Sequence, residues 1–275
     1  MKGIHRDFRN KVSEPQSLFG LDYRSISVQG SKETFLLLGG RGLGWEAVTH
    51  LAFFLYQLGH SVILVSLPGC GSSRDYKIIK PFPVQSFSIF SQFFGEMVRQ
   101  HGRMHVISHS MSGRYFADYL AKYESAQRDV KSVIFVNPSG FRKESPMLIF
   151  RFLLSKIMHK VQEMHGVDLE ELKALSFAPK TSMYSRVDRI GQRLAEIKYC
   201  MQGDILDSLK QIAIPRMVIL GERDFVFPSA TDMSIRTELE SAGCFVSVMD
   251  FDHNPTILPN AGDLAEEISL YAQNI

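Results

Sequence analysis

The sequence predicts one α/β domain, in which a mostly parallel sheet is flanked by helices and carries an inserted helical cap. Short apolar runs alternate with stretches of helical spacing along much of the chain, and this alternation is typical of parallel sheets covered on both faces. The alternation stops between residues 141 and 214, where only helical patterns occur. A chain of 275 residues is long enough for one large core with such an excursion. We therefore expect a single domain over residues 1–275 with a cap over residues 141–214.

The expected elements follow one another in a regular order. Each strand is a short apolar run followed by polar or glycine-rich residues, and the expected strands are 35–38, 61–66, 105–108, 132–136, 216–220 and 245–249. Helical spacing predicts helices over 45–58, 87–101, 111–123 and 263–273. Within the cap, Ser145 and Pro146 begin a first helix, Asp168 is the N-cap of a second, and a third spans about 184–201.

Composition and charge exclude several classes of protein. The chain has 31 lysines and arginines against 29 acids, and a net charge of +2 gives no electrostatic argument for a nucleic-acid partner. The longest apolar stretch, 147–158, is interrupted by Arg151 and Lys156 and is too short to span a bilayer. Nothing in the sequence indicates an oligomeric state.

The cysteines and the N-terminal residues favour a cytoplasmic location. Cys70, Cys200 and Cys244 are odd in number and widely spaced, which fits free thiols in a reducing compartment. Residues 1–12 carry several charges and no apolar core of a secretory signal. We therefore expect a cytoplasmic protein.

Ser110 is the candidate nucleophile. It lies in residues 106–113 (VISHSMSG), between a short apolar strand and an amphipathic helix. A nucleophile elbow has this arrangement, and its tight turn requires small residues two before and two after the nucleophile. Ser108 and Ser112 are small, although glycine is usual at both positions. The alternative is that Ser110 only caps the helix.

Asp224 and His253 are the candidate partners of this serine. A serine hydroxyl needs a histidine as its base, and the histidine needs a carboxylate that fixes its tautomer. Each candidate directly follows a predicted strand, in the order serine, acid, histidine, and catalytic groups of parallel sheets gather at that edge. Asp250, Asp252 and Glu222 are rival acids. The first two are disfavoured because they share a loop with His253.

Acyl transfer also needs donors for the developing oxyanion. The backbone N–H of Met111, directly after the candidate nucleophile, is expected to be one of them. The second is expected from the glycine-rich loop 39–45, where the backbone N–H of Arg41 is the candidate. A dinucleotide-binding loop is the alternative, but the G-x-G-x-x-G spacing is missing and no acid ends the next strand. We expect neither a cofactor nor a metal.

These residues together resemble the α/β-hydrolase fold family from about Ser25 to the end of the chain. Five segments carry the resemblance in the family's order: 39–41 is similar to its His-Gly-x oxyanion loop, 67–73 (LPGCGSS) to its DLPGHGRS turn, 108–113 (SHSMSG) to its GHSMGG elbow, 221–228 to its acid loop and 252–253 to its histidine loop. The resemblance implies that Ser110, Asp224 and His253 form the triad and that the backbones of Arg41 and Met111 form the oxyanion hole.

The chain departs from the family pattern at four supporting positions. Gly39 replaces a histidine, Ser66 replaces the aspartate before the Leu-Pro-Gly turn, and Ser108 and Ser112 replace the elbow glycines. These changes bear on rate and substrate preference rather than on the reacting groups. The serine itself excludes the aspartate nucleophile of dehalogenases and epoxide hydrolases of this fold.

The hypothesis from the sequence is a serine hydrolase that forms an acyl-enzyme. An apolar cap suggests a lipophilic small-molecule ester or thioester as the substrate. The alternatives are a carbon–carbon bond hydrolase or lyase of the same fold, and a noncatalytic ligand-binding or scaffold protein. The first cap helix could also lie on a membrane surface, with Arg151, Lys156 and Lys160 on its polar side.

Overall fold

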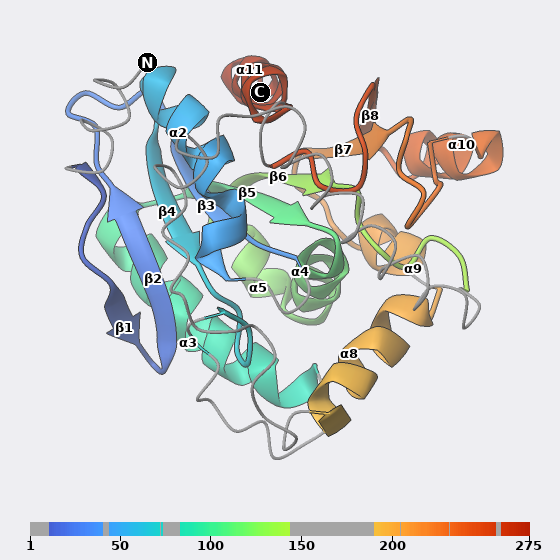
Figure 1. Ribbon diagram of the computed structural model, residues 1–275, viewed down its shortest axis with the longest axis horizontal. Coiled ribbons are helices and arrows are strands. Elements are labelled where there is room, and N and C mark those ends of the chain that lie inside the picture. Colours follow the sequence, from blue (N-terminus) through green and yellow to red (C-terminus); the bar gives the residue numbers. More distant parts are fainter. Residues whose placement is uncertain are drawn as a thin grey trace, which may run out of the picture.

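An eight-stranded, mostly parallel sheet forms the centre of the molecule (Figure 1). The computed structural model describes residues 11–40, 44–71, 73, 83–143, 190–203, 205–230, 232–256 and 260–275. Within them the strand order is β1-β2-β4-β3-β5-β6-β7-β8. The strands from β4 to β8 in this order pair in parallel, whereas β1 and β2 are antiparallel at one edge. The predicted α/β architecture is confirmed.

All six predicted strands are present, and two more precede them. The bounds are β1 Gln16–Leu18, β2 Leu21–Ile26, β3 Thr34–Leu38, β4 Ser61–Val65, β5 Met104–His109, β6 Val130–Val136, β7 Arg216–Gly221 and β8 Phe245–Met249. The inner strands were recognisable because their residues are buried on both faces. In β3, for example, Phe35 and Leu37 contact one core while Leu36 and Leu38 contact the other.

Helices cover both faces of this sheet (Figure 1). One face carries η1 (Trp45–Val48), α2 (Thr49–Gln57) and α11 (Ala261–Gln273). The other side carries α3 (Val84–His101), α4 (Met111–Lys122), α5 (Glu124–Gln127), α8 (Ile190–Met201), α9 (Ile205–Lys210) and α10 (Met233–Ser241). The helices expected over 45–58, 87–101, 111–123 and 263–273 are thus found, with ends shifted by a few residues.

No bounds were predicted from the sequence for β1, β2, α5, α9 or α10. β2 has polar residues between its buried ones, as an edge region that faces water on one side does. Helix α10 has little apolar periodicity, but it has a clear start signal. The Asp232 carboxylate accepts hydrogen bonds from the N–H groups of Ser234 (2.9 Å) and Ile235 (3.4 Å), as an N-cap does.

Most of the predicted cap lies outside the described residues, which exclude 144–189. The expected helix starts at Ser145 and Asp168 fall there, so the cap over 141–214 stays a prediction. The chain is described again from Ile190, and the residues that follow α8 return to the point where the chain leaves the described fold. The N–H of Ile205 donates to the C=O of Gly140 (3.1 Å), and a Cβ on Gly203 would lie 3.1 Å from the backbone nitrogen of Lys143.

A buried polar cluster fastens the returning chain to α4. The Arg114 guanidinium donates to the carbonyls of Tyr199 (2.6 Å) and Gln202 and lies 4.3 Å from the centre of the Tyr199 ring. The Asp118 carboxylate accepts hydrogen bonds from the hydroxyls of Tyr199 (2.5 Å) and Ser208 (2.6 Å). Helices α8 and α9 are therefore anchored on the helix that follows Ser110.

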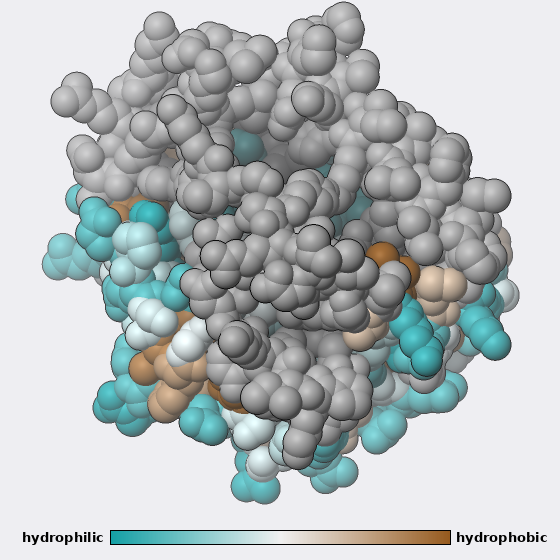
Figure 2. Space-filling model, turned by 60° about the horizontal axis from the view of Figure 1, so that its bottom comes forward, coloured by the Kyte–Doolittle hydropathy of each residue, from teal (hydrophilic) through white to brown (hydrophobic). Residues whose placement is uncertain are grey.

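The described surface is that of a protein with few exposed apolar groups. In Figure 2, hydrophilic side chains dominate the described part of this face, with apolar residues scattered among them. Among the described helices, none combines the length and the apolar character that crossing a bilayer requires. Cys70, Cys200 and Cys244 are buried free thiols, as expected.

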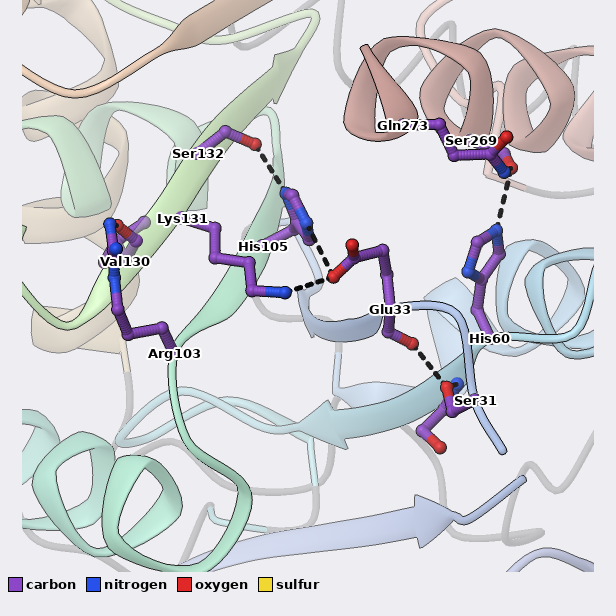
Figure 3. A network of polar contacts seen from close by, with 11 residues as sticks. Ser31, Glu33, His60, Arg103, His105, Val130, Lys131, Ser132, Ser269 and Gln273 are labelled. Atoms are coloured by element: carbon purple, nitrogen blue, oxygen red, sulfur yellow. Dashed lines mark hydrogen bonds and ion pairs between the residues drawn. The ribbon is translucent and has the colours of Figure 1, made fainter. Parts of the chain in front are cut away.

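A second polar network lies at the amino ends of the strands, opposite the edge where Ser110 lies (Figure 3). The Glu33 carboxylate accepts from the Lys131 ammonium and lies 3.2 Å from Nε2 of His105. Nearby, Nε2 of buried His60 lies 2.7 Å from the hydroxyl of Ser269. Burial lowers the pKa of His60 and of His105, and for His105 this outweighs the opposing effect of Glu33. Both imidazoles are therefore neutral near pH 7.

These neutral histidines predict acid sensitivity of the fold. In the unfolded chain a histidine side chain takes up a proton near pH 6.5 (about the value for a free side chain), whereas in the folded state it does so only at lower pH. The stability of the fold is therefore complete above about pH 7 and is lost as the pH falls towards the lowered pKa values. Each such histidine contributes a slope of up to about 1.4 kcal/mol per pH unit. When the free energy of unfolding is measured with urea between about pH 5 and pH 8, it should change less steeply with pH in His60→Gln than in the wild type. Identical slopes would rule out this role for His60.

Candidate active site

The backbone of Ser110 forms a tight turn between β5 and α4. Its φ of 60° and ψ of −121° lie in a region that residues with a Cβ rarely adopt. Its N–H donates to the C=O of Val136 (3.0 Å), and its C=O accepts from the N–H groups of Gly113 (3.0 Å) and Ser139 (3.2 Å). Hydrogen bonds from β6 and from the residues after it thus hold the turn in this conformation.

The residues after Ser110 fit the turn for reasons beyond size. The Ser112 hydroxyl accepts from the N–H of His109 (2.9 Å) and donates to the C=O of Leu38 or of His109, each 2.9 Å away. A Cβ on Gly113 would lie 2.7 Å from the Cβ of Pro138, so only glycine fits there. The serine at position 112 therefore adds hydrogen bonds that the family's glycine lacks.

The side chains of Ser110, His253 and Asp224 meet at the carboxyl edge of the sheet. The Ser110 Oγ lies 3.0 Å from Nε2 of His253, and Nδ1 of His253 lies 2.8 Å from Oδ2 of Asp224. All three residues are buried. Because a carboxylate only accepts hydrogen bonds, Nδ1 carries the imidazole proton and Nε2 offers its lone pair to the serine hydroxyl. The structure brings together the three residues that the sequence singled out.

The Asp224 carboxylate is held by the backbone of its own loop. Its Oδ1 accepts from the N–H groups of Val226 (2.8 Å) and Phe227 (3.0 Å), which leaves Oδ2 for His253. The Phe227 ring packs against the imidazole with 5.3 Å between ring centres. These contacts fix the carboxylate plane and compensate its charge away from bulk water.

The rival acids are engaged elsewhere. Asp250 is exposed and pairs with Arg223 (2.7 Å). The Asp252 carboxylate accepts from the N–H of Asn254 (2.8 Å). Glu222 is exposed to solvent. Asp224 is therefore the acid that the described geometry places against the histidine.

The expected oxyanion donors differ in how far the structure describes them. Met111 is the first residue of α4, where an N–H has no intrahelical acceptor and lies at the positive end of the helix dipole. Arg41 lies outside the described residues, so the second donor stays a prediction. The start of its loop is described: a Cβ on Gly40 would lie 3.1 Å from Nδ1 of His109 and 3.4 Å from the Cβ of Ser110.

The loop after β3 rests on the turn after β4. A Cβ on Gly44 would lie 2.9 Å from the Cα of Gly71, so a side chain here would push the two segments apart. The Ser66 hydroxyl, at the position of the family's aspartate, accepts from the N–H of Trp45 (3.1 Å). Ser66 thus holds the loop with a neutral group.

Sequence reasoning missed two residues that contact the histidine loop. Asn137, just after β6, accepts at Oδ1 from the N–H of Gly221 (2.7 Å) and donates from Nδ2 to the C=O of Asp252 (2.9 Å). His109, the last residue of β5, donates from Nε2 to the C=O of His253 (2.7 Å). The available signal was their position, since both lie at carboxyl ends of neighbouring parallel strands.

His109 is neutral in this environment. Burial, with a smaller effect of the neighbouring His253, lowers the pKa of His109 to about 3, although the hydrogen bond to the His253 carbonyl opposes the shift. Among the described side chains, no group of histidines, cysteines and acids is arranged to hold a metal ion.

Comparison with known proteins gives one family and many similar structures. The model of the alpha/beta hydrolase family matches residues 35–266. A bacterial membrane phospholipase A aligns with a TM-score of 0.69 at 17% identity, over 99% of this chain and 89% of its own. A lipase-esterase related protein from Clostridium acetobutylicum gives 0.67 at 19% identity, over 91% and 99%. The thioesterase domain from the curacin biosynthetic pathway gives 0.64 at 14% identity, over 93% and 98%. The search of curated proteins found no match.

The hydroxyl of Ser112 should contribute measurably to stability. Ser112→Ala leaves the buried N–H of His109 without its acceptor, which costs about 1–3 kcal/mol. Ser112→Gly restores the family pattern yet should cost about 0.5–1 kcal/mol more, because glycine loses more backbone entropy. Urea unfolding measures both. Ser108→Ala is the control, since the Ser108 hydroxyl lies 3.4 Å from its acceptor; equal stability of the two alanine variants would contradict the prediction.

Proposed function

The chain belongs to the alpha/beta hydrolase family, and from that premise we propose that it is a serine hydrolase acting on an ester or thioester of a lipophilic small molecule. The observation that carries this proposal is the line from the Ser110 hydroxyl through the His253 imidazole to the Asp224 carboxylate, at 3.0 and 2.8 Å. That line supplies a base for a weak nucleophile and an anchor for the base.

In the first half of the proposed reaction, Ser110 is acylated. Its Oγ forms a bond to the substrate carbonyl carbon while its proton moves to Nε2 of His253. The Asp224 carboxylate stabilises the imidazolium that forms, because it already accepts from Nδ1. The negative charge on the carbonyl oxygen faces the N–H of Met111, and Arg41 is the proposed second donor.

Loss of the leaving group completes the acylation. The tetrahedral intermediate collapses, the bond to the alcohol or thiol breaks, and His253 returns its proton to that leaving group. In the second half a water molecule attacks the acyl-enzyme and gives a proton to His253, the bond to the Ser110 oxygen breaks, and His253 passes the proton to that oxygen, so that a carboxylic acid and free Ser110 result. Both halves use the same pair of donors and the same imidazole.

The lipophilic substrate is supported by apolar side chains near the site and by the names of similar structures. A small pocket of about 100 Å³ lies between the loops that follow β6 and β7, where Phe141, Phe227 and Ile235 line it beside the charged Arg142 and Asp232, and the Phe227 ring also packs against His253. The phospholipase, lipase-related and thioesterase structures that share the fold act, by their names, on acyl compounds. We propose that residues 141–214 form the cap that covers the substrate, supported by the hydrogen bond from the N–H of Ile205 to the C=O of Gly140, which joins the C-terminal part of that segment to the residue before its start. We further propose that the protein is cytoplasmic.

Labelling with a fluorophosphonate probe tests the nucleophile and its base. The wild type should label at Ser110, and Ser110→Ala should not label. His253→Ala should lower the labelling rate by about 10³-fold or more, because the Ser110 hydroxyl loses its base. Asp224→Asn should lower it by about 10²–10⁴-fold, because the carboxylate that fixes the tautomer of His253 is lost. Ser132→Ala changes a buried serine at the opposite edge of the sheet and should label as the wild type does. A wild-type protein that never labels would indicate a noncatalytic protein.

Activity on a graded set of substrates tests the substrate class. We expect kcat/KM for p-nitrophenyl esters and acyl thioesters to rise with chain length from acetyl to octanoyl, by about 10-fold or more, because each buried methylene contributes about 0.8 kcal/mol. Steady-state kinetics measures this directly. If the enzyme reacts with the fluorophosphonate probe and hydrolyses no ester or thioester, but cleaves carbon–carbon bonds of β-diketones, the alternative reaction of this fold is favoured.

A further inference from the structure

We propose that His109 and Asn137 are positioning residues that together fix the backbone of His253. Each donates a hydrogen bond to one of two consecutive carbonyl groups, those of Asp252 and His253. This inference rests on the proposed function, since it concerns the residue that would act as the base. It adds to the proposal two side chains that touch none of the reacting atoms.

The two hydrogen bonds fix both peptide planes around His253. The carbonyl of Asp252 lies in the plane that precedes the His253 Cα, and the carbonyl of His253 lies in the plane that follows it. Because peptide units are planar, holding both planes sets φ and ψ of this residue and so the direction of its Cα–Cβ bond. The imidazole must reach Ser110 on one side and Asp224 on the other, and its backbone direction decides whether it reaches both.

His109 connects three parts of the site. A carbonyl only accepts hydrogen bonds, so the proton of the neutral His109 ring lies on Nε2, 2.7 Å from the C=O of His253. Its Nδ1 packs where a side chain at Gly40 would be, 3.1 Å from the Cβ position. The ring is the neighbour of Ser110 along the chain. It therefore sets the spacing among the nucleophile, the loop after β3 and the histidine loop.

Asn137 connects the acid loop with the histidine loop. Its amide has one acceptor and one donor end, and the partners decide the orientation: the Gly221 N–H requires Oδ1, and the Asp252 carbonyl requires Nδ2. Its own N–H donates to the C=O of Ile219 in β7 (2.9 Å). The side chain thus carries the rigidity of the sheet into two loops.

This support matters because the histidine loop follows the last strand. β8 is an edge strand and pairs with β7 on one side, with no strand of the described sheet on its other side. The N–H of Arg223, after β7, donates to the C=O of Phe251 (3.0 Å), and the contacts to Asp252 and His253 themselves reach across from the ends of β5 and β6. A neutral His109 suits this place, because a charged ring with its centre 5.2 Å from that of His253 would oppose the positive charge that His253 acquires in the reaction.

Matched substitutions separate the donor from the rest of the side chain. His109→Leu removes the donor, whereas His109→Gln keeps an N–H near the position of Nε2. Asn137→Asp keeps the acceptor for Gly221 and loses the donor to Asp252. We expect His109→Leu and Asn137→Asp each to lower kcat by about 10- to 100-fold with KM within about 3-fold, and His109→Gln to stay within about 5-fold of the wild type. The double variant should lose less than the product of the single losses, because either loss already releases the loop.

His60→Leu is the matched control. Like His109, His60 is a buried histidine, but its Nε2 lies against the hydroxyl of Ser269 at the opposite edge of the sheet. The substitution His60→Leu should lower the temperature of unfolding and leave kcat unchanged at a temperature where the variant is folded. A loss of kcat in His60→Leu equal to that in His109→Leu would reduce the role of His109 to general stability and overturn the proposal.

A measurement without substrate decides the positioning independently. The proton on Nδ1 of His253, held by Asp224, gives a downfield proton NMR signal when the pair is ordered. The signal should be present in the wild type, His109→Gln and His60→Leu, and broadened or lost in His109→Leu and Asn137→Asp. An unchanged signal in the last two variants would overturn the inference. If the wild type shows the signal but neither labels nor turns over esters, the proposed function fails while the positioning is still decided.

Discussion

The site depends on the backbone conformation of a single residue, Ser110. A φ of 60° at a residue with a Cβ costs about 1–3 kcal/mol, and such a conformation persists only where surrounding contacts determine it fully. Here those contacts come from Val136 and Ser139 to the backbone of Ser110 itself, and from Ser112 to the residue before it. The turn lifts the Ser110 hydroxyl away from the sheet and towards the imidazole, and it leaves the N–H of Met111 at the start of α4.

A parallel sheet explains why distant residues can meet so closely. The strand ends are spaced regularly, so the loops after β5, β6, β7 and β8 begin as neighbours whatever their separation along the chain. Side chains at these ends then join one loop to the next, as Asn137 does between Gly221 and Asp252. The opposite edge carries polar groups too, but there Glu33 and Lys131 compensate each other and support the fold.

Much of this arrangement could be predicted from the sequence, for physical reasons that differ by residue. The inner strands are continuous apolar runs, and Ser110, Asp224 and His253 follow such runs, so their positions could be read in order. β2 was not recognised, because its alternation of buried and polar residues is short and is broken where Arg24 and Ser25 follow one another. The contacts of His109 and Asn137 could not be predicted either, because they donate to backbone carbonyls. Every residue has a backbone carbonyl, so the sequence does not indicate which one will accept a hydrogen bond.

The meeting of the chain at Gly140 and Ile205 has an evolutionary consequence. A segment whose two ends lie together can be lengthened, shortened or exchanged without moving the elements on which those ends sit. Arg114 and Asp118 restrict this freedom to the residues before α8, since they anchor α8 and α9 on α4. Under the proposed function, divergence in the residues before α8 would change substrate preference while Ser110, Asp224 and His253 stay in place.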